Sequence, residues 1–426
     1  MSIKLTQKLS SVAICSASML VSVAFNAQAT GVIPPDPDTF LTFLERHVPE
    51  DAVSATAYYA AVDPDGKKTT YADWLVETGF INNRGDYSTT GPFDVNPDST
   101  TVVHQNIADL GFIRRVTARC EPSCTDPNPN IYSVIENYPT FDDAANRTNR
   151  LASVTMERVS AADGSSPSNK IITFYAYTGA DSRNQLNSAG ESIPFQPDLD
   201  GRGEKPIPGL CNTCHGGTPE KLKKDGSYAN SGNTGALFLP MDLNNFAFDP
   251  NLARGLTKAD QQTAYKKMNQ VALITHRGTK DEDEVAGGSR LPGGHELIEG
   301  WYGGPGMPGN IFNGDFVPPG WLPPAAPVGV DELYLKSVAP GCRACHVQQE
   351  RALDFATYEG FMVFEDAHKE LVLNVECGLS DDPKIREKAD NQAVMPLALE
   401  TYKKFWESEE AAVFKDHLGT VDCNDL

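Results

Sequence analysis

The order of hydrophobic and polar positions predicts a first half that mixes helices and strands. Residues 39–48 and 52–62 have the pattern of helices. Residues 151–159 and 170–177 have the pattern of strands, and the second run, Ile-Ile-Thr-Phe-Tyr-Ala-Tyr after a lysine, is β-branched and aromatic. We therefore expect residues 30–200 to form a mixed α+β domain, whose role the pattern does not indicate.

Later helices are expected between loop-rich stretches. Residues 258–276 predict a helix that Thr257 caps, with Asp260 three residues on and Gly278 as a stop. Residues 331–338 predict a short helix, and Pro396 opens a long one that runs to about residue 417. Two mostly α, loop-rich domains are therefore expected after the first, at residues 201–330 and 331–426.

Composition and charge narrow the possible partners. The 426 residues include 35 Gly and 30 Pro, which indicates many turns, and acidic residues outnumber basic ones by 57 to 36, for a net charge of −21. A charge of this sign argues against nucleic acid and against anionic membrane surfaces as partners. It is compatible with a partner protein that has a basic surface, or simply with solubility.

The first 29 residues have the pattern of a secretory signal peptide. Lys4 and Lys8 precede an apolar run over residues 12–25, and Ala27-Gln-Ala29 matches a small-x-small cleavage site. A membrane anchor is the alternative, but the run is short and rich in serine. No later stretch approaches 18 apolar residues. We expect a periplasmic or secreted chain that starts near Thr30 and has no membrane span.

Two copies of Cys-x-x-Cys-His carry the most specific chemistry in the sequence. The first is Cys211-Asn-Thr-Cys214-His215, and the second is Cys342-Arg-Ala-Cys345-His346. This pattern is typical of c-type haem attachment. Two thiols add to the two vinyl groups of one porphyrin, and the adjacent histidine becomes an iron ligand. The sequence therefore predicts two covalently bound haem c groups.

Two other chemistries use similar residues. A redox-active Cys-x-x-Cys does not need the histidine and follows a strand at the start of a helix. A zinc ion held by the four motif cysteines is the more serious rival. The two histidines and the expected export weigh against it.

The four remaining cysteines of the mature chain form an even set, and an oxidising compartment favours disulfides. Cys120 and Cys124 are close enough in sequence to close a small loop. Cys377 would then pair with Cys423, although this is one of three connectivities.

The last 95 or so residues resemble a class I cytochrome c domain. A helix leads into Cys342, a Met-Pro pair follows at Met395-Pro396, and an amphipathic helix ends the chain. The resemblance implies that His346 and the sulfur of Met395 bind the iron of the second haem from opposite sides. A core methionine before a helix is the alternative for Met395.

The first motif departs from this pattern, because no helix leads into Cys211. Met307, in Gly-Pro-Gly-Met-Pro-Gly, looks like the methionine loop of bacterial monohaem cytochromes and is our candidate for the second ligand. Met241 is nearer in sequence. His276 and His295 are further candidates, and either would lower the reduction potential.

Two functions are compatible with these residues. In the first, both irons have six ligands and the protein transfers single electrons between redox partners. In the second, the first haem keeps an open position and the chain is an oxidoreductase, as in dihaem peroxidases and rubber-oxygenase-like dioxygenases. Trp301 and Trp321 lie between the motifs in sequence and would then bridge the haems. Electron transfer is the favoured interpretation.

Overall fold

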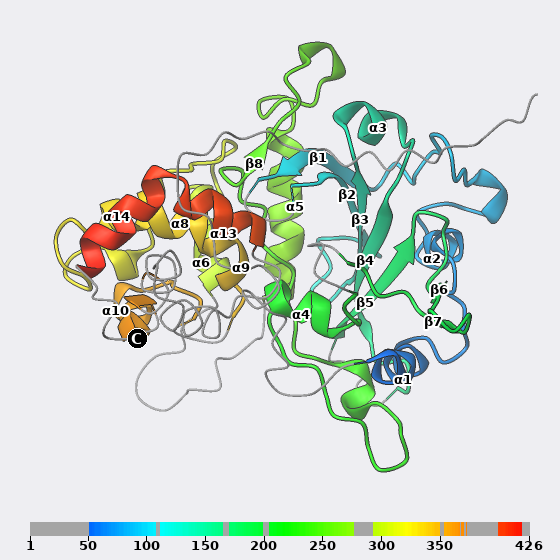
Figure 1. Cartoon of the computed structure of the whole chain (residues 1–426). Helices are drawn as coiled ribbons and strands as arrows, with labels where there is room; N and C mark the ends of the chain where they lie inside the picture. The colour runs from blue at the N-terminus through cyan, green and yellow to red at the C-terminus, as the bar shows by residue number, and fades with distance from the viewer. Residues whose placement is uncertain are drawn as a thin grey trace, which may run out of the picture. The chain divides into compact units, whose positions relative to one another are not determined.

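An antiparallel sheet forms the centre of the fold (Figure 1). We used a computed structural model, which describes residues 51–107, 111–164, 170–198, 204–276, 293–349, 353–366, 368–369, 372 and 399–419. In these ranges six strands pair in the order β5-β4-β3-β2-β1-β8. They are β1 (Thr100–Asn106), β2 (Ile113–Glu121), β3 (Asn130–Tyr138), β4 (Ala152–Ser160), β5 (Lys170–Thr178) and β8 (Phe246–Ala247).

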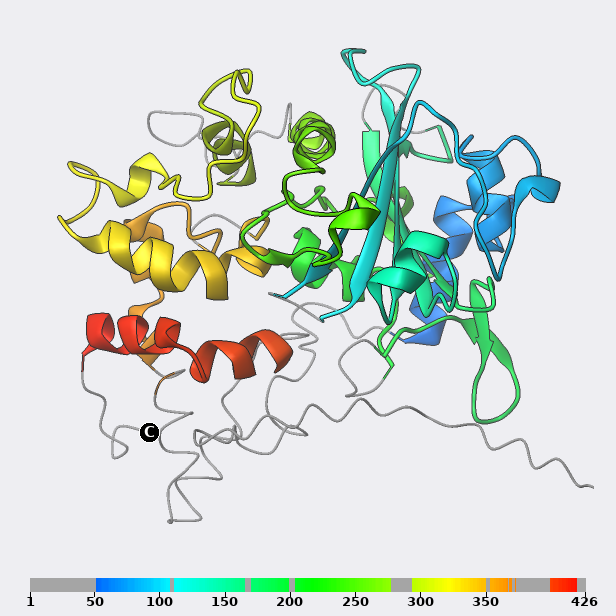
Figure 2. The same cartoon turned by 90° about the horizontal axis from the view of Figure 1, so that it is seen from above.

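Different helices cover the two faces of the sheet (Figure 2). On one face, Trp74 of α2 (Tyr71–Glu77) donates its indole N–H to Glu157 of β4 at 2.7 Å. On the other face, the Nδ1 atom of His104 in β1 lies 2.8 Å from the hydroxyl of Tyr265 in α5 (Gln262–Thr275). Neighbouring residues of a strand alternate between these two layers. We call the faces the α2 face and the α5 face.

Strand β5 lies at one edge of the sheet, and helix α1 (Ala52–Val62) packs against it. The hydroxyls of Tyr58 and Tyr59 accept the backbone N–H groups of Phe174 and Ala176, at 2.8 and 3.2 Å. These bonds occupy backbone donors of an edge strand, which would otherwise offer a template for pairing with another chain.

The remaining elements of the sheet half are short. They are η1 (Arg84–Asp86), α3 (Phe141–Asn146) and the two-stranded pair of β6 (Asn184–Leu186) and β7 (Ser192–Pro194).

Short helices dominate the rest of the described chain. They are α4 (Gly209–His215), η2 (Ala229–Gly232), η3 (Leu252–Arg254), α6 (Gly293–Trp301), η4 (Pro319–Trp321), α7 (Val330–Leu333), the π-helical turn η5 (Tyr334–Val338), α8 (Ala339–Gly341), α9 (Arg343–His346), α10 (Tyr358–Met362), α13 (Leu399–Trp406) and α14 (Glu409–Leu418).

The expected fold class, an α+β domain followed by two mostly α cytochrome-type haem domains, is wrong. A large antiparallel sheet dominates instead, and β8, from the expected first haem domain, completes it by pairing with β1. One hydrophobic core includes Tyr58, Tyr265 and Phe405, which come from all three expected domains. The physical reason is that helices as short as α4 and α9 bury too little apolar surface to form a core of their own, and they pack on shared elements instead.

Several local predictions are confirmed. The helix predicted over residues 52–62 is α1, and the two predicted strands are β4 and β5 within one residue at each end. The helix predicted over residues 258–276 is α5, but it begins later, at Gln262, and its N-cap is Gln261, so the predicted cap at Thr257 is wrong. The expected bonds between Thr257 and Asp260 are present in the turn that precedes it.

The long helix predicted after Pro396 is wrong in the part that the structure describes. It breaks between α13 and α14, and Ser408 caps the second helix by accepting the backbone N–H of Glu410 at 3.2 Å. The helix predicted over residues 39–48 lies outside the described residues. Among the described helices, none combines the length and the apolar character needed to cross a membrane.

Candidate functional site

The first Cys-x-x-Cys-His motif forms the last part of α4, from Cys211 to His215. Its histidine, His215, has Nδ1 2.9 Å from the carbonyl oxygen of Leu237. A carbonyl oxygen only accepts hydrogen bonds, so Nδ1 carries the proton and Nε2 carries the lone pair that can bind a metal. The imidazole lies 5.6 Å from the ring of Phe174, on the α5 face of the sheet. The motif therefore rests directly on the sheet.

The second motif follows η5 and α8 and ends with α9. Its histidine repeats the arrangement of the first, with Nδ1 of His346 2.9 Å from the carbonyl oxygen of Leu353. The ring of Phe355 stacks on the imidazole, with centroids 4.3 Å apart and planes at 14°. Such hydrogen bonds fix the tautomer and the orientation of a histidine that binds a metal.

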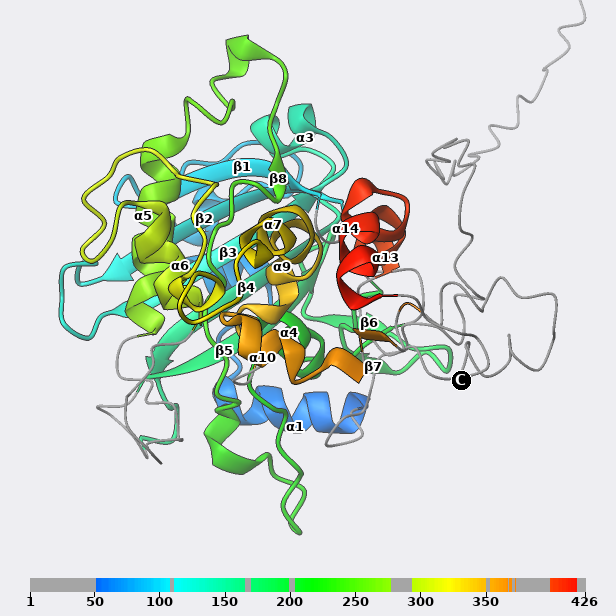
Figure 3. The same cartoon turned by 90° about the vertical axis from the view of Figure 1, so that its left-hand side faces the viewer.

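The two motifs lie side by side, as Figures 1 and 3 show for α4 and α9. The Sγ atoms of Cys214 and Cys345 are 4.0 Å apart. The side-chain amide of Gln349 donates to the carbonyl oxygen of Thr213 at 2.8 Å. The sequence separates these cysteines by 131 residues, and nothing in its pattern indicated that they would meet.

Gly216 allows this close approach. Its φ is +69°, and a Cβ atom built on it would lie 2.0 Å from the carbonyl oxygen of Gln348. Any larger residue would push the backbone after the first motif away from the backbone after the second.

The four motif cysteines are half-buried thiols that form no disulfide. Burial, with a smaller effect from Glu410, raises the pKa of Cys342 to about 12, so this thiol is protonated at neutral pH. Outside the motifs, the loop expected between Cys120 and Cys124 is closed by a disulfide. Cys377 and Cys423 lie outside the described residues.

Each motif offers two thiols and one oriented imidazole, which is the donor set that one haem c takes. A structural zinc site needs four ligands around one point. Within the described residues no three His, Cys, Asp or Glu side chains gather in a way that could hold a metal ion.

Of the two methionines proposed as second iron ligands, Met395 lies outside the described residues. Met307 is buried, and its φ of +53° is uncommon for a residue with a side chain. Its loop is held against the end of α6 by bonds from Met307 N–H to Gly304 and from Gly309 N–H to Tyr302. Both bonds join residues that are close together in the sequence, and neither involves His215.

Two other candidates from the sequence, His276 and Met241, lie near the motifs or on the segment that follows the first motif. His276 is fully buried, and its Nε2 is 3.1 Å from the carbonyl oxygen of Phe238 and 2.8 Å from the amide of Gln348. It therefore touches segments that follow both motifs. Burial lowers its pKa to about 4, which keeps it neutral. Met241 is half-buried, and its backbone bonds to the side chain of Asn269 at 2.8 and 3.0 Å.

His295, the last candidate, is engaged locally, with Nε2 3.6 Å from Glu299 in the same helix.

Trp301 and Trp321 are both buried beside the second motif segment. The ring of Trp301 lies 5.4 Å from the guanidinium of Arg343, and Trp321 donates its indole N–H to the carbonyl oxygen of Phe355 at 2.8 Å. These contacts make both side chains part of the wall around the second motif.

One residue of the second motif, Arg343, forms a buried ion pair that no sequence pattern indicated. Arg343 stands between Cys342 and Cys345, and its guanidinium bonds to Asp242 at 2.6 and 2.9 Å. Both side chains are buried. Burial alone would lower the pKa of Arg343, but Asp242 and the nearby Tyr334 hold it above its usual value. A charged residue at an x position of the motif was visible in the sequence, but its partner was not.

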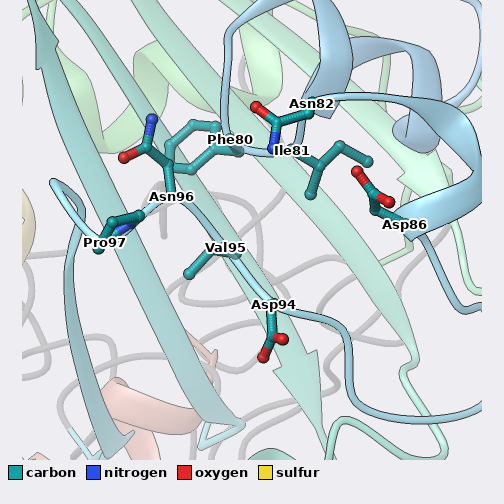
Figure 4. A pocket seen from close by; sticks show the side chains of 8 residues that line it. All are labelled: Phe80, Ile81, Asn82, Asp86, Asp94, Val95, Asn96 and Pro97. Atoms are coloured by element: carbon teal, nitrogen blue, oxygen red, sulfur yellow. The ribbon is translucent and has the colours of Figure 1, made fainter.

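Residues between positions 80 and 97 line a pocket of about 500 Å³ (Figure 4). It lies between the turn after α2 and the extended segment before β1. Phe80, Ile81 and Val95 contribute apolar surface, and Asp86 and Asp94 contribute carboxylates. None of its lining residues belongs to either motif.

Comparison of the chain with protein-family models, with curated proteins and with solved structures found no match.

Proposed function

We propose that this chain is an exported dihaem c-type cytochrome that transfers single electrons between redox partners. The observation that supports it most is the meeting of the two Cys-x-x-Cys-His motifs, with 4.0 Å between Cys214 Sγ and Cys345 Sγ. When bound, each haem supplies an iron that alternates between the ferric and ferrous states.

The protein's part is to hold the two groups close together and in fixed orientations. Cys211 and Cys214 would attach the first haem, and Cys342 and Cys345 the second. His215 and His346 would each bind an iron through Nε2, because Nδ1 is committed to a backbone carbonyl. Met307 and Met395 stay the predicted second ligands of the two irons.

The surroundings of the motifs suit electron transfer. Because the packing of α4 on α9 is fixed by Gln349 and Gly216, little rearrangement is expected when charge moves between the motifs. The cysteines are half-buried, so each motif reaches the surface where a partner can approach. A net charge of −21 favours a partner with a basic surface.

Optical and EPR spectra of the purified ferric protein, repeated after reduction and addition of carbon monoxide, test this function. We expect two low-spin haems that do not bind carbon monoxide, because a carrier leaves no position open. One high-spin haem that binds carbon monoxide would contradict the carrier and support the oxidoreductase, with peroxide and oxygen as the first substrates to try.

A further inference from the structure

The buried ion pair between Arg343 and Asp242 lies at the second motif itself. Arg343 lies within the loop that would attach the second haem, three residues before His346. Asp242 comes from the loop that follows the first motif, 101 residues earlier. The pair therefore joins the two motif segments through two opposite charges.

Both charges are held tightly. Nε and Nη2 of Arg343 donate to the same oxygen, Oδ2 of Asp242, and Nη1 donates to the hydroxyl of Tyr334 at 3.0 Å. Oδ2 also accepts the side-chain amide of Asn245 at 3.0 Å, and Oδ1 accepts the backbone N–H of Asn244 at 3.2 Å. Each charge is thus kept in one place and one orientation.

The aromatic walls around the guanidinium exclude water. The rings of Trp301 and Tyr334 lie 5.4 and 5.5 Å from it. Fixed charges in such surroundings are weakly screened and act strongly on a neighbouring redox group. A positive charge favours uptake of an electron, and a negative charge opposes it.

We propose that Arg343 and Asp242 are positioning residues that set the reduction potential of the haem at the second motif, with Asp242 offsetting the charge of Arg343. This inference rests on the proposed function. Reduction adds one electron to the iron from an external reductant, and no bond of the pair forms or breaks.

The test is a potentiometric titration of the holoprotein, with dithionite as reductant, after intact mass has confirmed two haems. Asp242→Asn leaves the guanidinium uncompensated and should raise the midpoint potential of one haem. Arg343→Gln leaves the carboxylate uncompensated and should lower the potential of the same haem. Arg343→Lys keeps the positive charge, so the midpoint potential of this haem should stay close to its value in the unchanged protein. A Cys211→Ala/Cys214→Ala background, which keeps only the second motif, identifies the haem that responds.

A matched control separates potential from stability. Glu136 and Arg147 form another buried ion pair, 3.3 Å apart. Glu136 shares the α2 face with Val134, Thr155 and Tyr175, whereas His215 contacts Phe174 on the opposite face. Glu136→Gln should therefore lower the free energy of unfolding and leave both potentials unchanged.

The results separate the inference from the proposed function. A chain that binds no haem contradicts the proposed function. Two haems whose potentials stay constant in both single variants, or move in the same direction, overturn the inference alone. If one single variant does not fold, the double variant Asp242→Asn/Arg343→Gln, which buries no unpaired charge, becomes the reference. The midpoint potential of the remaining single variant must then differ from that of the double variant in the stated direction.

Discussion

At the scale of single residues, burial decides the charge state of the histidines. His104 and His276 are almost completely enclosed, and burial lowers the pKa of both, to about 4 for His276. Each is neutral in the folded protein near pH 7. In the unfolded chain a histidine titrates near pH 6.5. Between about pH 4 and pH 6.5, His276 therefore binds fewer protons in the folded protein than in the unfolded chain.

This difference predicts a loss of stability in acid. Stability from a group with a depressed pKa is present above the unfolded value and falls as the pH drops toward the folded value. For His276 the window runs from pH 6.5 to about 4, and the loss is about 3 kcal/mol at 1.36 kcal/mol for each pKa unit.

Urea unfolding at several pH values measures this loss. His276→Gln, which cannot titrate, should show a weaker pH dependence than the unchanged protein, and His104 should supply part of what remains. An equal slope in both proteins would contradict the assignment.

At the scale of elements, the contact between α4 and α9 depends on Gly216. Gly216→Ala would introduce a Cβ atom 2.0 Å from Gln348 O in a backbone region that alanine seldom adopts. Gly226 has a similar φ of +82°, but a Cβ atom added there would have nothing within 4 Å, so Gly226→Ala meets only the backbone cost. Comparison of the two variants therefore separates the backbone cost of the positive φ from the cost of the steric clash with Gln348.

We expect Gly226→Ala to lose about 1 kcal/mol of the free energy of unfolding. Gly216→Ala should lose a further 1–3 kcal/mol or so, the usual cost of overpacking. Chemical denaturation checks both values. Equal losses would show that the close approach of the two motif segments is not a constraint on the fold.

The elements also show which parts of the fold could be predicted from the sequence. Strands β4 and β5 and helix α1 were predictable because their apolar and β-branched residues follow one local pattern. The pairing of β8 with β1 was not, because two residues carry no periodicity and their partner lies about 140 residues earlier. The break before α14 was missed because Ser408 caps locally within a stretch that is otherwise helical in pattern.

Some features of the candidate site could likewise be predicted from the sequence, and others could not. Its donors, the two motifs, were visible in the sequence because their spacing is local. Three features were not visible: the 4.0 Å approach of Cys214 to Cys345, the carbonyl partners of His215 and His346, and the ion pair of Arg343. The cysteine approach and the ion pair join residues that lie 131 and 101 positions apart, and the carbonyl partners depend on the path of loops that carry no periodic pattern.

At the scale of the whole molecule, one core supports both motifs. The first motif rests on β5 through Phe174, and the second lies against the first and is tied to Asp242. In the part of the chain that the structure describes, the last 95 or so residues therefore share this core and do not form the separate, mostly α-helical domain that the resemblance implied. A dihaem cytochrome built this way would hold its two groups on a shared β scaffold.

The most direct test of the central claim is the intact mass of the exported chain, produced in cells that attach haem c. We predict the added mass of two haems, and of one haem in Cys342→Ala/Cys345→Ala and in Cys211→Ala/Cys214→Ala. Cys120→Ala/Cys124→Ala, which removes the disulfide outside the motifs, should keep both. A soluble, folded chain without added haem would contradict the account.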